Sequence, residues 1–177
     1  MYLNKPINTP RLTLRSLQKD DAGAPYLSWM QDADVLRFLE PRDGGYDRHS
    51  LEQYIADMNN SESNLMLGLV RRDSGAHIGN IKLGGINTEH MDGHIGILIG
   101  DKTAWGHGYA SEAISAVSNH AADELDLKRV YAGCHANNPG SWKAFINAGF
   151  SEEKRQKQSC QVDGKWVDSL TMGRILQ

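Results

Sequence analysis

The chain has 177 residues, of which 40% are hydrophobic and 23% charged, and its formal net charge is −3. This length and composition predict one globular domain, residues 1–177, with enough chain to bury a core. Because no excess of basic residues is present, we expect neither nucleic acid nor an anionic membrane surface as a partner.

The first predicted elements are a strand and short helices. Residues 11–15 alternate apolar and charged side chains, as in a half-buried strand. Residues 17–39 are helical in patches, and their glycine and proline predict two short helices rather than one. Residues 50–60 carry apolar side chains at helical spacing, which predicts a helix capped by Ser50.

Three strands and a long helix follow. Residues 65–72 and 77–84 flank a DSGA turn, which predicts a hairpin. Residues 94–100 form a third strand with three isoleucines on one face. Apolar residues then recur at three- and four-residue steps from Ala110 to Leu125, which predicts an amphipathic helix.

The last elements are a strand, a helix and a hairpin. Residues 129–136 alternate like a strand, and Asn138, Pro139 and Gly149 have the types expected at the N-cap, first position and left-handed end of a helix. A DG turn between two extended runs predicts a terminal hairpin. Strands, then a β-α-β unit, then a hairpin indicate an α+β domain with a mixed sheet.

The sequence WGHGYA, residues 105–110, joins a buried strand to the long helix. Gly106 and Gly108 allow a sharp turn and close approach to a ligand. The free N–H groups and the dipole of the helix N-terminus favour an anion there. From these residues alone, a phosphate site and a tight structural corner are equally supported.

Two longer segments, HIGILIGDKTAWGHGYASEAI and NNPGSWKAFINAGF, resemble the Gcn5-related N-acetyltransferase (GNAT) superfamily, in its RimJ/RimL-like branch. PRLTLR, WMQDADVLRFL and GKWVDSLTMG extend the likeness over nearly the whole chain. The resemblance implies a mostly antiparallel central sheet that is splayed in a V and flanked by helices. It also implies an enzyme that transfers an acetyl group from acetyl-CoA, its co-substrate, to a primary amine.

The resemblance further implies where coenzyme A binds. The superfamily loop Arg/Gln-x-x-Gly-x-Gly/Ala corresponds to Trp105, Gly106, His107, Gly108, Tyr109 and Ala110, with Trp105 replacing the usual Arg or Gln. Backbone N–H groups of this loop would hold the pyrophosphate. The main chain of Ile97, Leu98 and Ile99 would pair with the pantetheine arm, which Asn138 would also touch while capping its helix.

Acetyl transfer needs a neutral amine, a polarised thioester and a protonated leaving thiolate. The family often places a carboxylate base at the position of His94, for which an ordinary surface histidine is an equal alternative; Asp92 and His90 lie nearby. Many members of the family use a tyrosine as the general acid, and Phe145 stands at the corresponding position here. The Asn-x-x-Ser pattern instead makes Ser141 the candidate acid and a coenzyme contact.

Other residues near these motifs are expected to be structural. Glu112 lies in the first helical turn, where the dipole favours a carboxylate. Trp142, Phe145 and Ile146 are expected to pack in the core or on the adenine side. The loop HMDGH is not interpreted as a metal site, so no metal is expected.

The identity of the acceptor amine is the part of the function that the sequence determines least. Trp29, Glu40 and Arg42, with Arg37 and Tyr46, are candidates for the substrate side. The segment HIGNIKLG favours a small-molecule amine such as an amino sugar. The alternatives are a peptide amine, as in the acetylation of ribosomal-protein N-termini, and a non-catalytic acyl-CoA-binding module. A homodimer stays open as an alternative.

Apolar runs and cysteines bear on where the protein is located. No run reaches the roughly 20 apolar residues that span a bilayer, and no signal-peptide pattern is present. Cys134 and Cys160 lack metal-ligand spacing and a disulfide framework, which favours reduced thiols. We therefore expect a cytoplasmic protein.

Overall fold

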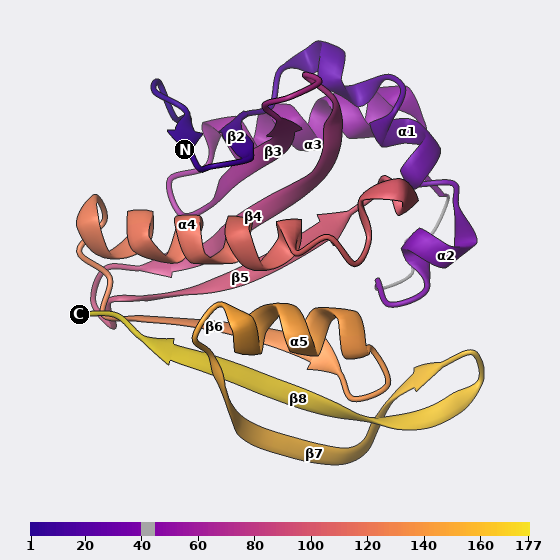
Figure 1. Cartoon of the computed structure of the whole chain (residues 1–177), viewed down its shortest axis with the longest axis vertical. Coiled ribbons are helices and arrows are strands. Elements are labelled where there is room, and N and C mark those ends of the chain that lie inside the picture. The colour runs from indigo at the N-terminus through magenta and orange to yellow at the C-terminus, as the bar shows by residue number, and fades with distance from the viewer. Residues whose placement is uncertain (40–44) are drawn as a thin grey trace.

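The computed structural model describes residues 1–39 and 45–177 (Figure 1). Its elements in chain order are β1 (Ile7–Asn8), β2 (Leu12–Ser16), the 3-10 helix η1 (Lys19–Ala22), α1 (Tyr26–Trp29), α2 (Ala33–Leu36), α3 (Arg48–Asn60), β3 (Leu65–Arg71), β4 (His77–Asn87), β5 (Asp92–Ile99), the 3-10 helix η2 (Lys102–Ala104), α4 (Tyr109–Asp123), β6 (Arg129–His135), α5 (Pro139–Asn147), β7 (Ser151–Val162) and β8 (Lys165–Ile175).

One eight-stranded sheet connects these strands in the order β1-β2-β3-β4-β5-β6-β8-β7. Neighbouring strands are antiparallel except β5 and β6, which are parallel. This confirms the predicted α+β class with a mixed, mostly antiparallel sheet. The predicted hairpins are also present, as β3–β4 and β7–β8.

Two predicted helix boundaries were wrong. Helix α3 is capped by Asp47, whose carboxylate accepts a 2.7 Å hydrogen bond from the Ser50 N–H, while the Ser50 hydroxyl accepts from the Asp47 N–H at 3.1 Å. Ser50 is therefore the third helical residue of a reciprocal capping box, not the cap. Helix α4 ends at Asp123, so Leu125 packs against the core from beyond the helix.

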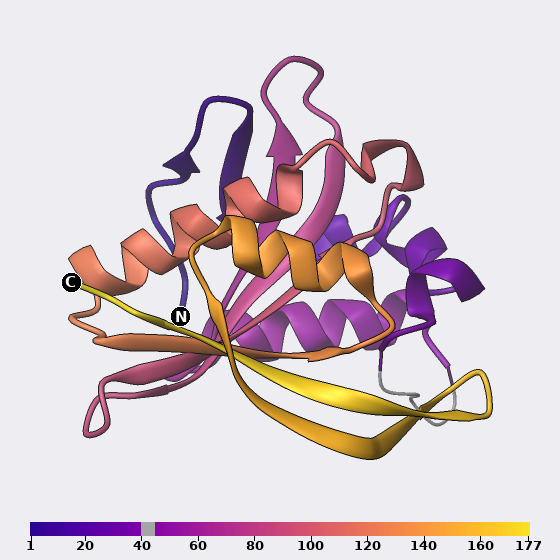
Figure 2. The same ribbon diagram turned by 60° about the horizontal axis from the view of Figure 1, so that its bottom comes forward.

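Helices cover both faces of the sheet (Figures 1 and 2). Helices α4 and α5 lie on one face, where Ile95, Ile97 and Ile99 pack with them in the larger hydrophobic core. Helices α1 and α3 lie on the other face and form a second core, to which Leu98 belongs. The alternation of side chains along β5 therefore separates two sides of the molecule, as its isoleucine pattern predicted.

Strands β5 and β6 are hydrogen-bonded over only a short stretch. Residues Asp92–His94 pair with Arg129–Tyr131, and the pairing ends there. Beyond it the two strands separate, as Figures 1 and 2 show. This confirms the expected V, and within the described residues it leaves one edge of Ile95–Ile99 without a strand partner.

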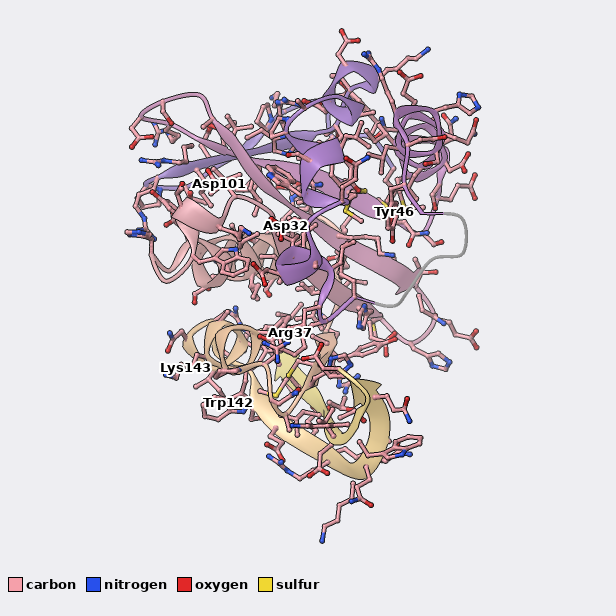
Figure 3. The ribbon with its side chains drawn as sticks, turned by 90° about the vertical axis from the view of Figure 1, so that its right-hand side faces the viewer. Asp32, Arg37, Tyr46, Asp101, Trp142 and Lys143 are labelled. Atoms are coloured by element: carbon pink, nitrogen blue, oxygen red, sulfur yellow. The ribbon has the colours of Figure 1, made fainter. Side chains whose placement is uncertain are left out.

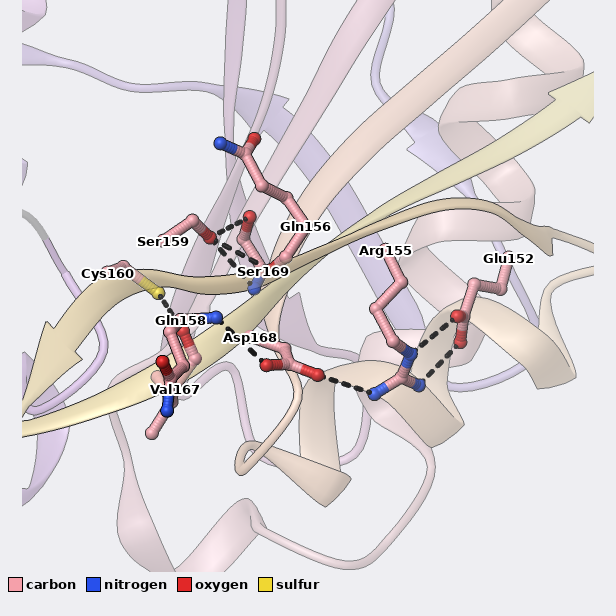
Figure 4. A network of polar contacts seen from close by, with 9 residues as sticks. All are labelled: Glu152, Arg155, Gln156, Gln158, Ser159, Cys160, Val167, Asp168 and Ser169. Atoms are coloured by element: carbon pink, nitrogen blue, oxygen red, sulfur yellow. Dashed lines mark hydrogen bonds and ion pairs between the residues drawn. The ribbon is translucent and has the colours of Figure 1, made fainter.

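The β7–β8 hairpin is long and irregular (Figure 4). Its register shifts between Gln156 and Cys160, where Gln158 takes a φ of 45°. Asp168 compensates by accepting a 3.0 Å hydrogen bond from the Gln158 N–H, and the hydroxyls of Ser159 and Ser169 lie 2.7 Å apart. Such a bulge bends a hairpin while side chains satisfy the freed backbone groups.

Two findings bear on the expected location. No helix in the described part of the chain is long and apolar enough to cross a membrane. Cys134 is buried and Cys160 half-buried, and both are free thiols.

Candidate functional site

The glycine loop between η2 and α4 is shaped for close approach of a ligand. Gly106 and Gly108 have φ values of 77° and 78°, in the left-handed region, and Gly108 is the N-cap of α4. A Cβ atom added at Gly106 would meet no atom within 4 Å. Because Gly108 has no side chain to accept the first N–H groups of the helix, no cap residue occupies these donors, as in an anion site.

Arg11 and Glu112 tie this loop to the start of β2. The Arg11 Nε donates to a Glu112 carboxylate oxygen at 2.6 Å, its Nη1 donates to the His107 carbonyl at 2.8 Å, and its guanidinium lies 4.6 Å from the centre of the Tyr109 ring. The same carboxylate accepts from the Thr9 hydroxyl at 2.6 Å. Glu112 is thus structural, as expected, whereas sequence reasoning missed Arg11.

The protonation state of Glu112 follows from these bonds. Burial raises its pKa, but the hydrogen bonds from Thr9 and Arg11 and the Arg11 charge outweigh this effect and hold the pKa below its usual range. Glu112 is therefore ionised at neutral pH. Its negative charge also offsets that of Arg11 beside the loop.

Trp105, the departure from the usual loop pattern, has a defined contact. Its indole Nε1 donates a 2.7 Å hydrogen bond to the carbonyl of Ile99. The Ile99 carbonyl therefore points away from β4. Because backbone groups alternate in direction along a strand, the N–H and C=O of Ile97 also point away from β4. Leu98 pairs with Asn80 of β4. Among the three predicted pantetheine partners, Ile97 thus has its backbone directed at the unpaired edge.

His94 lies at the point where β5 and β6 separate. It pairs with Gly84 of β4 and with Tyr131 of β6, and its ring meets the Tyr131 ring edge-on, with centroids 5.4 Å apart. Burial lowers the pKa of His94, and the nearby positive charge of Lys82 lowers it further. The imidazole is therefore neutral at pH 7 and able to accept a proton.

The neighbours of His94 are less suited to act as a base. Asp92 is engaged in an ion pair, with its carboxylate 3.8 Å from the Arg129 guanidinium. His90 is exposed in the β4–β5 turn, where its N–H donates to Asn87. Tyr131, which faces His94, was not singled out from the sequence because only the parallel register brings it there.

Helix α5 begins as predicted, with Asn138 as its cap and Pro139 in its first turn. The Asn138 side chain accepts a 3.1 Å hydrogen bond from the Ser141 N–H. Ser141 is half-buried, and its hydroxyl makes no hydrogen bond within residues 1–39 and 45–177. That hydroxyl is therefore free to bind a ligand.

Other residues of α5 divide between core and surface. Phe145 is buried, with its ring edge-on to Phe150 at 5.1 Å, so a phenol at this position would point into the core. Trp142 packs against the same core. Ile146 is 38% exposed, so of its two expected places, the core and the adenine side, it does not lie in the core.

The substrate-side candidates in the described part of the chain have different surroundings. Trp29 is only 5% exposed and packs against His77, with ring centroids 5.0 Å apart. Glu40 and Arg42 lie outside the described residues. Arg37 lies between the two halves of the molecule (Figure 3), where its Nε and Nη2 donate to Asp163 of the β7–β8 turn at 2.8 and 2.7 Å. Tyr46 is half-buried beside the second core.

Comparisons with known proteins agree with this architecture. The acetyltransferase (GNAT) domain family matches residues 11–151. The uncharacterized N-acetyltransferase YoaA of Bacillus subtilis (strain 168) is 28% identical over 165 residues, which cover 92% of each chain.

Solved structures show the same fold. RimL, a ribosomal alpha-N-protein acetyltransferase in complex with coenzyme A, has a TM-score of 0.85 at 18% identity, covering 97% of this chain and 98% of that one. Spermidine N-acetyltransferase from Vibrio cholerae, in complex with CoA and spermine, has a TM-score of 0.83 at 20% identity, covering 94% and 96%.

A sheet splayed beside a glycine loop, together with these relatives, defines an acyltransferase of the N-acetyltransferase class. The chain belongs to the acetyltransferase (GNAT) domain family, whose model matches most of its length. The predicted superfamily is thereby confirmed, and the likeness to RimL agrees with the RimJ/RimL-like branch. Among the described residues, no group of three or more His, Cys, Asp or Glu side chains is placed to hold a metal.

Replacing Gly108 with valine tests the loop as an anion site. A Cβ-branched side chain would block approach to the N–H groups of α4, so coenzyme A should no longer raise the melting temperature as it does by mass action in the parent protein. Gly75→Val is the matched control, because Gly75 has a φ of 71° and open space around it in the β3–β4 turn.

Both variants should lose about 1 to 3 kcal/mol of unfolding free energy from backbone strain. Only Gly108→Val should lose the response to coenzyme A in thermal denaturation. Equal responses in the two variants would mean that the loop is a structural corner.

Proposed function

We propose that this protein transfers an acetyl group from acetyl-CoA directly to a primary amine, and that the amine belongs to a small molecule such as an amino sugar. One observation carries the proposal: the unpaired edge of β5 lies between the glycine loop at the start of α4 and the neutral His94. A donor and an acceptor can therefore meet at that edge from opposite faces of the sheet.

On the α4–α5 face, the proposed donor site uses backbone groups more than side chains. The N–H groups from Gly106 to Ala110 would bind the pyrophosphate, and Ile97 would pair with the pantetheine amides. Asn138 and Ser141 lie at the start of α5, where they would contact the end of that arm. We propose that the whole chain, residues 1–177, works as one such domain.

The proposed reaction assigns one proton transfer to each face. His94 accepts a proton from the acceptor amine, directly or through water, and the amine nitrogen then attacks the thioester carbonyl carbon. The resulting tetrahedral species gives its second nitrogen proton to solvent and collapses, the C–S bond breaks, and the sulfur takes a proton from the Ser141 hydroxyl, which solvent reprotonates. The products are an N-acetylated amine and coenzyme A.

A second candidate is a protein N-terminal acetyltransferase, supported by the TM-score of 0.85 to RimL. The decisive experiment measures thiol release from acetyl-CoA with amino sugars, polyamines and peptides with free N-termini. Turnover with amino sugars supports the first proposal, and turnover with peptides alone supports the second. Binding of acetyl-CoA without release to any amine would instead indicate a non-catalytic acyl-CoA-binding module.

His94 is expected to shape the pH dependence. Because its pKa lies below the ordinary value of about 6.5, kcat/KM should rise as pH increases through that lowered pKa and the imidazolium loses its proton. His94→Ala should lose this inflection and roughly 10- to 1,000-fold in rate. Steady-state kinetics between pH 5 and 9 provide the measurement, with His90→Ala as the control. An unchanged profile in His94→Ala would assign the deprotonation to water.

Ser141 is expected to act on the leaving group. Its position in the first turn of α5 lets the helix dipole and the hydroxyl stabilise negative charge that develops on sulfur. Ser141→Ala should therefore lower kcat while leaving the Kd for acetyl-CoA nearly unchanged. Ser141→Thr, which keeps a hydroxyl, should retain more activity. A parental kcat in Ser141→Ala, measured by thiol release, would show that the thiolate leaves without a side-chain acid.

A further inference from the structure

Lys82 differs from the other half-buried cations of the described residues. Arg15, Arg71 and Arg129 each form an ion pair with a carboxylate, and Arg174 donates to the Ala148 carbonyl and the Asn119 side chain. The ammonium of Lys82 forms no ion pair or hydrogen bond in this part of the chain. The ammonium is therefore available to bind an anionic partner.

The side chain of Lys82 extends toward His94. A Cβ atom added at Gly84 would lie 3.1 Å from the Cε and 3.5 Å from the Cδ of Lys82, so the lysine stem runs over this glycine. Gly84 is the residue of β4 that pairs with His94. The effect of the Lys82 charge on the pKa of His94 agrees with this proximity.

Open space lies on the same face of the sheet. Gly96, which pairs with Lys82, and Gly133 of β6 alternate with His94 and Tyr131, so all face the α3 side. A Cβ atom at either glycine would meet nothing within 4 Å. The two glycines therefore leave room beside His94 on both of the separating strands.

One cation beside this space has no carboxylate partner. Asp92 lies on the same face as His94, but its carboxylate is 3.8 Å from the Arg129 guanidinium. Arg129 also pairs with Glu153, and Arg37 pairs with Asp163. Among the described cations beside His94, Lys82 is thus the one that forms no ion pair with a carboxylate.

From this arrangement, and resting on the proposed transferase function, we propose that Lys82 selects acceptor amines that carry a phosphate or carboxylate group. The ammonium would donate charge-assisted hydrogen bonds to that anion. It would repel acceptors with additional ammonium groups, such as polyamines. It also disfavours the protonated form of the acceptor amine itself, which must lose its proton before it attacks.

Matched acceptors test the proposal. Glucosamine 6-phosphate and glucosamine differ by a phosphate group, and 4-aminobutyrate and n-butylamine differ by a carboxylate group. Spermidine is included as a polycationic acceptor. The parent protein should favour the anionic member of at least one pair in kcat/KM. Lys82→Met should lower the kcat/KM preference for that member over its neutral counterpart about 10- to 100-fold, the loss expected for a charge-assisted hydrogen bond; the effects of Lys82 on His94 and on the acceptor amine are common to both members and cancel in this ratio.

Two variants serve as controls. Lys82→Arg keeps the charge and should keep the preference. Lys5→Met removes an equal charge at an exposed position near the N-terminus and should behave like the parent protein. A preference for neutral amines or spermidine, or an equal loss for both members of each pair in Lys82→Met, would overturn the inference.

Failure of the transferase proposal has a different signature. In that case coenzyme A would not raise the melting temperature and no amine would release thiol from acetyl-CoA. If coenzyme A binds but no amine reacts, calorimetry on the CoA-saturated protein tests whether glucosamine 6-phosphate or 4-aminobutyrate still binds at Lys82. Binding weakened by Lys82→Met supports the inference, and absent or unchanged binding rejects it.

Discussion

The short parallel pairing of β5 with β6 is the constraint on which the site depends. Three residues of β5 pair with β6, and the ladder ends at His94 and Tyr131. Had the pairing continued, the backbone groups of Ile97 would be satisfied within the sheet and unavailable to a ligand. Ending it leaves an edge that a linear molecule with amide groups can complete, which is a common way for a sheet to bind an extended partner.

The side chains around this edge hold it in a defined shape. Arg11 connects the loop carbonyl of His107 to Glu112, and Trp105 donates to the carbonyl of Ile99. A chain segment with two left-handed glycines would otherwise be free to adopt several conformations. The indole of Trp105 thus fixes the loop to β5 at the position where the superfamily usually has Arg or Gln.

The sequence predicted what depends on local pattern. Strand and helix positions followed from alternation and caps, and Gly149 takes the predicted left-handed conformation, with a φ of 85°. It did not predict contacts that depend on register between distant strands, such as Tyr131 against His94, or the pairing of Arg11 with Glu112. Trp29 illustrates the same limit, because an aromatic residue near a substrate side and one buried in a core look alike in a single sequence.

Glycines near His94 determine both the position of the Lys82 charge and the open space beside the imidazole. Gly84 leaves room for the Lys82 stem, and Gly96 and Gly133 leave the space in front of it open. A larger residue at position 84 would displace the ammonium from His94, and the imidazole would then regain part of its ordinary basicity. The glycines of β4, β5 and β6 therefore control the charge of the site as well as its volume, although none of them carries a functional group.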